Sequence, residues 1–174
     1  MGGGLSTPDG DAKTFKNLAD IHFRKEQYYE AIIFYTSAIS QLVNADGVVP
    51  IDTGNRRVDH QGAGDGDMLV KLYGNRSAAY VHAGSYQRAL DDALRAIELD
   101  PLYCKGYYRA AKALLALCDD RNIEAIEYID KAIAVARPGE DSLLVKQLKD
   151  MQAGLLRGGG TAWKGNGWLR FIYY

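Results

Sequence analysis

The chain has 174 residues, of which 47% are apolar, and this is enough for one domain with a sizeable core. Its 21 Lys and Arg residues nearly balance its 22 Asp and Glu residues, so the net charge of −1 excludes the broad positive field of a nucleic-acid-binding domain. Two cysteines are too few for a disulfide framework, and no apolar run approaches a membrane span. We expect a cytoplasmic protein with reduced thiols and no stable membrane insertion.

Residues 1–11 contain the sequence MGGGLS, which matches the pattern for N-myristoylation at Gly2. The other explanation, which the shortness of the pattern favours, is a flexible glycine-rich leader or an appended sequence. Even if Gly2 were acylated, one myristoyl chain would attach the protein to a membrane only marginally.

Amphipathic segments then follow in pairs, and the second member of each pair has one form: a bulky residue, Ala, apolar positions at helical spacing, and Ala again. Ala31, Ala89 and Ala125 are equivalent in the three copies and lie 58 and 36 residues apart. These spacings are 34 plus an insertion of 24 residues and 34 plus an insertion of 2 residues. The unit is therefore a helical hairpin of about 34 residues, present three times.

The predicted elements, in chain order, are hairpins over about 12–43, 70–103 and 104–138 and a capping helix over about 140–156. A loop over about 44–67 separates the first two hairpins, and its Gly, Asp and Asn content predicts that it is mobile. Its aspartates lack the offsets of an EF-hand and its GAGDG lacks the flanking strand and helix of a dinucleotide loop, so we expect no metal or cofactor there.

The hairpins resemble tetratricopeptide repeats. Small residues recur where the two helices of a hairpin would approach closely, at Ala19, Ser77 and Ala111. The second repeat keeps the family's Tyr73, Tyr80, Ala89, Ala96 and Pro101, and the first keeps Phe15, Leu18, Ala31, Tyr35 and Ala38. The resemblance implies an all-α fold in which three hairpins stack as a right-handed superhelix, closed by the capping helix.

The resemblance also implies a binding site on the concave face, which the first helix of each repeat lines. Asn75, Lys105 and Arg109 match positions of the two-carboxylate-clamp subgroup, and Lys16 matches the first repeat's lysine. That subgroup binds the C-terminal Glu-Glu-Val-Asp of cytosolic heat-shock chaperones of the ninety and seventy kilodalton classes. Such a ligand would also explain why two cations, Lys105 and Arg109, share one helix face despite their repulsion.

One residue departs from the clamp pattern. Asp20 stands where the subgroup has a second Asn, one turn after Lys16, and an ionised carboxylate would pair with Lys16 and lower the affinity for an anionic ligand. Asn17 would substitute as the donor if the first helix were shifted. Phe23 and Tyr108 are further candidates for the lining of the groove.

No catalytic motif accompanies these residues, and the three histidines are scattered, so we expect a non-enzymatic adaptor without cofactors or metal. The alternative is a repeat scaffold that binds other peptides without chaperone specificity, and a third possibility is a targeting domain cut from a larger enzyme.

The last segment, 157–174, joins a glycine-rich linker to an aromatic tail with Trp163, Trp168 and Phe171. Three explanations of this tail stay open: it docks on another protein, it packs back onto the repeats, or it is not native sequence.

Overall fold

The computed structural model describes residues 10–43, 64–117, 121–139 and 141–157, and within these ranges every regular secondary-structure element is a helix. This confirms the all-α class. The sequence-based expectations for the leader, most of the inserted loop and the aromatic tail concern residues outside the described ranges. The helices are α1 (Ala12–Arg24), α2 (Tyr28–Leu42), α3 (Asp65–His82), α4 (Tyr86–Leu99), α5 (Cys104–Leu117), α6 (Asn122–Val135) and α7 (Ser142–Leu156).

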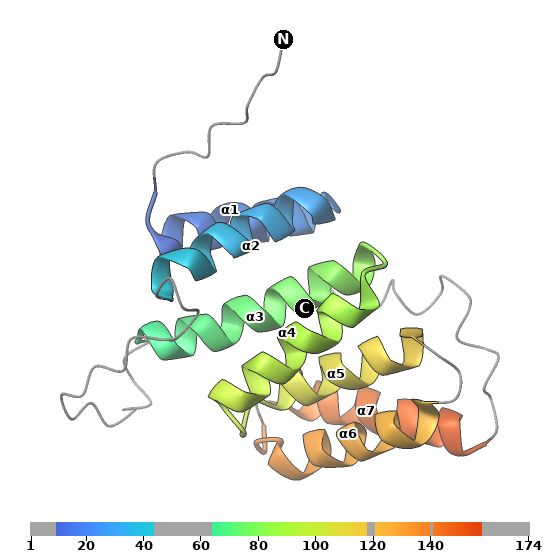
Figure 1. Ribbon diagram of the computed structural model, residues 1–174. Coiled ribbons are helices and arrows are strands. Elements are labelled where there is room, and N and C mark those ends of the chain that lie inside the picture. The colour runs from blue at the N-terminus through green and yellow to red at the C-terminus, as the bar shows by residue number, and fades with distance from the viewer. Residues whose placement is uncertain (1–9, 44–63, 118–120, 140, 158–174) are drawn as a thin grey trace.

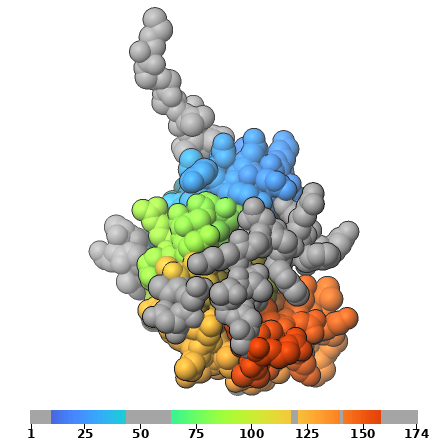
Figure 2. Space-filling view, turned by 90° about the vertical axis from the view of Figure 1, so that its right-hand side faces the viewer, coloured from blue at the N-terminus to red at the C-terminus, as the bar shows by residue number. Residues whose placement is uncertain are grey.

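Consecutive helices form hairpins that stack on one another. α1 packs on α2, α3 on α4 and α5 on α6, while contacts of α2 with α3 and of α4 with α5 join successive hairpins. Figure 1 shows α1 and α2 at the top of the stack and α5, α6 and α7 at the bottom. Figure 2 shows the same order from another side, as blue, green and orange layers. The stack of helical hairpins implied by the resemblance is therefore present.

Local signals begin and end the helices. The Asp11 carboxylate caps α1, because its Oδ1 accepts a hydrogen bond from the Thr14 amide at 2.8 Å, and this bond lowers the pKa of Asp11. The turn after α1 contains Glu26 at φ 60°, and the turn after α3 contains Gly84 at φ 74°. A glycine adopts this left-handed conformation without steric cost, whereas Glu26 does so at a cost of about 1–2 kcal/mol.

The start of α3 corrects the predicted end of the inserted loop. We expected the loop to run to about residue 67, but α3 begins at Asp65 with Gly64 as its N-cap. Asp65 and Asp67 lie in the first turn, where a carboxylate interacts favourably with the helix dipole, and Asp67 accepts a hydrogen bond from Lys71 at 2.6 Å. Acidic residues and glycine mark a helix start as well as a loop, which explains the error.

The small residues expected at close helix contacts are all buried. Ala19, Ser77 and Ala111 have no exposed surface, and the Ser77 hydroxyl donates to the Ala89 carbonyl at 2.7 Å. The larger apolar side chains form two separate clusters. The upper core contains Phe15, Tyr35, Ile39, Leu69 and Leu72. The lower core contains Leu90, Leu114, Ile129, Leu148 and Met151.

None of the described helices combines the length and the apolar character that a membrane span requires.

Candidate functional site

An open pocket of about 160 Å³ lies where the first helices of the three hairpins meet. α1, α3 and α5 supply all but one of its lining residues, and α2 supplies the other. The residues that line it are Asp20, Phe23, Arg24, Tyr35, Asn75, Ala78 and Arg109. The pocket therefore lies on the helices that the resemblance assigned to the binding face.

The Asp20 carboxylate accepts three hydrogen bonds at one side of this pocket. The donors are the Lys16 ammonium at 2.7 Å, the Tyr35 hydroxyl at 2.5 Å and the Asn75 amide at 3.4 Å. Burial and the bond to Asp20 both raise the pKa of Tyr35, so its hydroxyl keeps its proton and stays a donor. The expected pairing of Asp20 with Lys16 is present, and the carboxylate is already well satisfied before any ligand binds.

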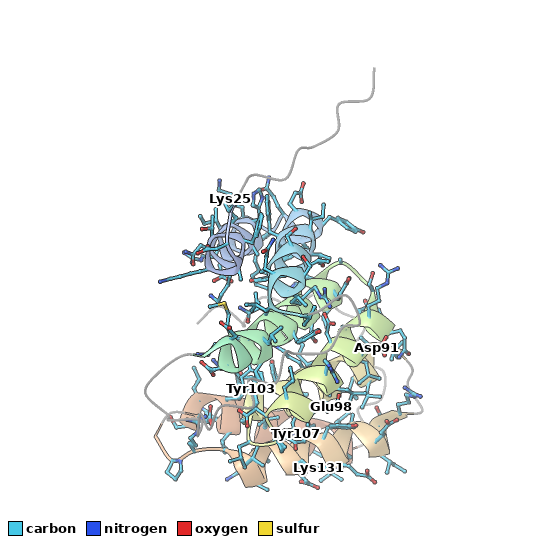
Figure 3. The ribbon with its side chains drawn as sticks, turned by 60° about the vertical axis from the view of Figure 1, so that its left-hand side comes forward. Lys25, Asp91, Glu98, Tyr103, Tyr107 and Lys131 are labelled. Atoms are coloured by element: carbon cyan, nitrogen blue, oxygen red, sulfur yellow. The ribbon has the colours of Figure 1, made fainter. Side chains whose placement is uncertain are left out.

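Arg109 forms the other side of the pocket. Its guanidinium donates to the Asn75 side-chain oxygen at 3.1 Å and to the Tyr103 hydroxyl at 2.9 Å. Tyr103 is labelled in Figure 3. The guanidinium passes close to the backbone of Gly74, where a Cβ atom would lie 2.2 Å from the Arg109 Nη1 atom. The absence of a side chain at Gly74 thus leaves the space in which Arg109 reaches Asn75.

The structure brings some of the predicted clamp residues together. Asp20, Asn75 and Arg109 meet through the hydrogen bonds described above. Lys16 joins them through Asp20, and its side chain is 25% exposed, but it does not line the pocket. Lys105 is exposed on α5, one turn before Arg109, and is also outside the pocket lining. The pocket is therefore built by a subset of the predicted residues, and neither lysine is part of its lining.

The three residues suggested for the groove differ in their positions. Phe23 lines the pocket. Asn17 is exposed and does not line it. Tyr108 is only 7% exposed and packs in the lower core, where burial raises its pKa to about 12.

Two cations were not identified from the sequence, one that lines the pocket and one that follows Arg109 on α5. Arg24 lines the pocket from the end of α1, four residues after Asp20. Lys112 follows Arg109 by three residues on α5, and burial together with the charge of Arg109 lowers its pKa to about 8. Spacings of three and four residues place side chains on one helix face, and this signal could have identified both.

Several curated proteins are similar to this chain in sequence. Mouse serine/threonine-protein phosphatase 5 is 38% identical over 106 residues, which are 61% of this chain and 16% of the phosphatase. The Hsp70/Hsp90 co-chaperone cns1 of Schizosaccharomyces pombe is 28% identical over 137 residues, which are 79% of this chain and 32% of cns1. The chain thus spans a third or less of the length of these relatives. No protein-family model matches it.

Solved structures show the same fold. The TPR2B-domain:pHsp70-complex of yeast Sti1 matches with a TM-score of 0.64 and 20% identity, over 84% of this chain and 97% of that one. The first TPR of Spaghetti (RPAP3) bound to the HSP90 peptide SRMEEVD matches with a TM-score of 0.58 and 20% identity, over 83% and 95% of the two chains. At these identities the likeness concerns the fold.

Proposed function

We propose that this tetratricopeptide repeat domain, which is homologous to that of serine/threonine-protein phosphatase 5, is a co-chaperone adaptor that binds the C-terminal Glu-Glu-Val-Asp of a heat-shock chaperone. The observation that carries the proposal is the meeting of Asn75 and Arg109 at a pocket between α3 and α5. Co-chaperone relatives and structural neighbours with Hsp70 and Hsp90 peptides support it. Its role is binding, not catalysis, and we place it in the cytoplasm.

The chemistry of the pocket suits a C-terminal aspartate, which carries a main-chain and a side-chain carboxylate. Arg109 and the exposed Lys105 supply charge-assisted donors, and the Asn75 amide supplies a neutral one. A hydrogen bond to a charged group contributes on the order of 1.5–3 kcal/mol. A few such bonds give micromolar affinity once the cost of ordering the peptide is subtracted.

Asp20 opposes this binding in the free domain. Its carboxylate engages the Lys16 ammonium and the Asn75 amide, two donors that the ligand would use. A bound peptide must compete for these donors and tolerate the negative charge of Asp20. We therefore propose a weaker clamp than one with an amide at this position.

Fluorescence polarisation with a labelled SRMEEVD peptide tests the proposal, beside the same peptide with an amidated C-terminus. The free carboxylate should bind in the micromolar range, and amidation should weaken binding at least tenfold. Arg109→Ala and Lys105→Ala should each cost about 1–3 kcal/mol, and Asp20→Asn should strengthen binding by about 1 kcal/mol. Arg95→Ala, which removes a cation on α4, a helix that supplies no residue to the pocket lining, is the matched control.

Equal affinity for the free and the amidated peptide, or no measurable binding to either, would reject the chaperone assignment. The second candidate is then a scaffold that binds other peptides, and the carboxylate at Asp20 is the observation that favours it, because it makes the pocket less positive. We retain residues 12–156 as the boundaries of the repeat domain in either case.

A further inference from the structure

Lys112 is a cation of the groove that the clamp pattern does not include. Its side chain is partly buried on α5, and its Nζ atom lies 5.7 Å from the centre of the Tyr108 ring. It forms no hydrogen bond or ion pair with any other residue that the structure describes. A partly buried ammonium without a carboxylate partner is costly, and an anionic ligand would lower that cost.

The contacts between helices place Lys112 one turn beyond the pocket. Asp20 bonds to Asn75, and three residues further along α1 the Phe23 ring contacts His82 with 5.6 Å between ring centres. α1 and α3 therefore run in the same direction. α5 follows them, since Arg109 bonds to Asn75 and the charge of Lys112 acts on His82.

Electrostatic effects link Lys112 to groups on both sides of it. Burial and the charge of Arg109 lower the pKa of Lys112 to about 8, and burial and the charge of Lys112 lower the pKa of His82. Lys112 thus follows Arg109 on the same face of α5, and its charge also acts on His82, which belongs to an aromatic wall. That wall is the stacked pair His82 and Tyr28, with ring centres 4.6 Å apart.

The positive charge of the groove is concentrated along α5. Asp20 neutralises Lys16 on α1. On α5, Lys105, Arg109 and Lys112 follow one another at spacings of four and three residues, which places them on one helix face. A ligand with several carboxylates therefore meets more favourable charge along α5 than along α1.

We propose that Lys112, together with Arg109, forms a second anion-binding subsite for the side-chain carboxylate of an acidic residue that precedes the ligand's C-terminus. This inference rests on the proposed function, because the terminal carboxylate is taken to occupy the pocket beside Asn75. An acidic side chain two or three residues upstream of the C-terminal residue, where SRMEEVD has its two Glu residues, would then extend along α5 toward the ammonium.

A double-mutant cycle between protein and peptide tests the subsite. The peptides are SRMEEVD and two forms in which one Glu is replaced by Gln, and the proteins are the parent, Lys112→Met and Lys112→Arg. In the parent, one of the two Gln peptides should bind about tenfold more weakly than SRMEEVD. In Lys112→Met that difference should shrink to less than about twofold, and in Lys112→Arg it should persist.

Lys131→Met is the matched control, since Lys131 also lies over a tyrosine ring, with its Nζ atom 5.2 Å from the centre of Tyr128, but is exposed on α6 (Figure 3). It should leave all affinities unchanged. A circular dichroism melt of each variant confirms that it is folded. Suppose that SRMEEVD binds and that its affinity depends on its C-terminal carboxylate, but each Glu-to-Gln change lowers the affinity by the same factor in the parent and in Lys112→Met. The subsite is then wrong and the proposed function stands. If SRMEEVD does not bind the parent, both are overturned.

Discussion

The Asp20 carboxylate affects how favourably the pocket binds an anion. It holds a lysine, a tyrosine and an asparagine at hydrogen-bonding distance, so three donors are oriented before binding. Orientation in advance lowers the entropy cost of binding, whereas the negative charge raises the electrostatic cost. An amide at the same position would keep the first effect and remove the second.

Gly74 determines whether Arg109 can reach the pocket. In Gly74→Ala, the new methyl group would occupy the space of the Arg109 Nη1 atom, and the guanidinium would have to move away from Asn75. We expect SRMEEVD to bind about tenfold more weakly, as measured by fluorescence polarisation. The free energy of unfolding should not fall by a comparable amount, because alanine forms helices better than glycine does.

Gly154→Ala is the control for this substitution. Gly154 lies within α7, where a Cβ atom would meet no other atom within 4 Å. This variant should gain up to about 1 kcal/mol in the free energy of unfolding, with unchanged affinity. Unchanged affinity in Gly74→Ala would contradict the role given to that glycine.

At the residue scale, the sequence predicted the contacts within one helix better than those between helices. The pair Lys16 and Asp20 follows directly from the spacing of four residues. The approach of Arg109 to Gly74 and Tyr103 depends on how closely α3 and α5 pack, and no local pattern contains that information. The same is true of the Tyr35 hydroxyl, which reaches Asp20 from α2.

At the scale of helices, Arg76 joins three of them. Its guanidinium donates two hydrogen bonds to the Asp92 carboxylate on α4, at 2.7 and 2.8 Å, and a third to Thr36 on α2 at 3.0 Å. The Arg76 and Asp92 side chains are 14% and 9% exposed. Burial raises the pKa of Asp92, and the guanidinium opposes this rise. The pair thus fixes the second hairpin and its contact with the first.

Removal of one partner of this pair should be strongly destabilising. Asp92→Ala leaves the Arg76 charge buried without its carboxylate, and we expect a loss of about 3–5 kcal/mol in the free energy of unfolding, measured by urea denaturation. The double variant Arg76→Met with Asp92→Leu should recover most of that loss. Glu98→Ala, which breaks an exposed pair with Arg95 on α4, should cost less than about 1 kcal/mol. An equal cost for Asp92→Ala and Glu98→Ala would contradict this role.

The helices themselves followed well from the sequence, because the repeated Ala positions and the amphipathic spacing are properties of each segment alone. Ala31, Ala89 and Ala125 are indeed all fully buried. The start of α3 was missed, since Gly64, Asp65 and Asp67 suit a loop and a helix start equally.

At the scale of the whole molecule, the pocket combines residues from helices that belong to two cores. α1 and α2 belong to the upper core, whereas α5, α6 and α7 belong to the lower core. In a stack of repeats each hairpin is stabilised mainly by its neighbours, so the first hairpin, which packs on a neighbour at one side and does so mainly through α2 on α3, should open most easily.

Hydrogen exchange measures this difference. Amides of α1 and α2 should exchange at least tenfold faster than those of α4 and α5 in the free domain. Saturating SRMEEVD should slow exchange in α1 and α2 more than in α4, because the pocket includes residues of α1 as well as α5. The amidated peptide is the control and should change little. Uniform protection across all the helices, with or without peptide, would contradict the two-core description.

Many alanines between the helices of this fold have no exposed surface, including Ala38, Ala79, Ala93 and Ala110. A methyl side chain has little volume to lose, and almost any replacement adds atoms at a position that is already fully buried. Replacing one of these buried alanines by a larger residue should therefore lower the free energy of unfolding more than shortening a leucine at the edge of either core. Sequence variation among relatives would then be confined to positions outside these buried alanines, including the groove residues that determine binding specificity.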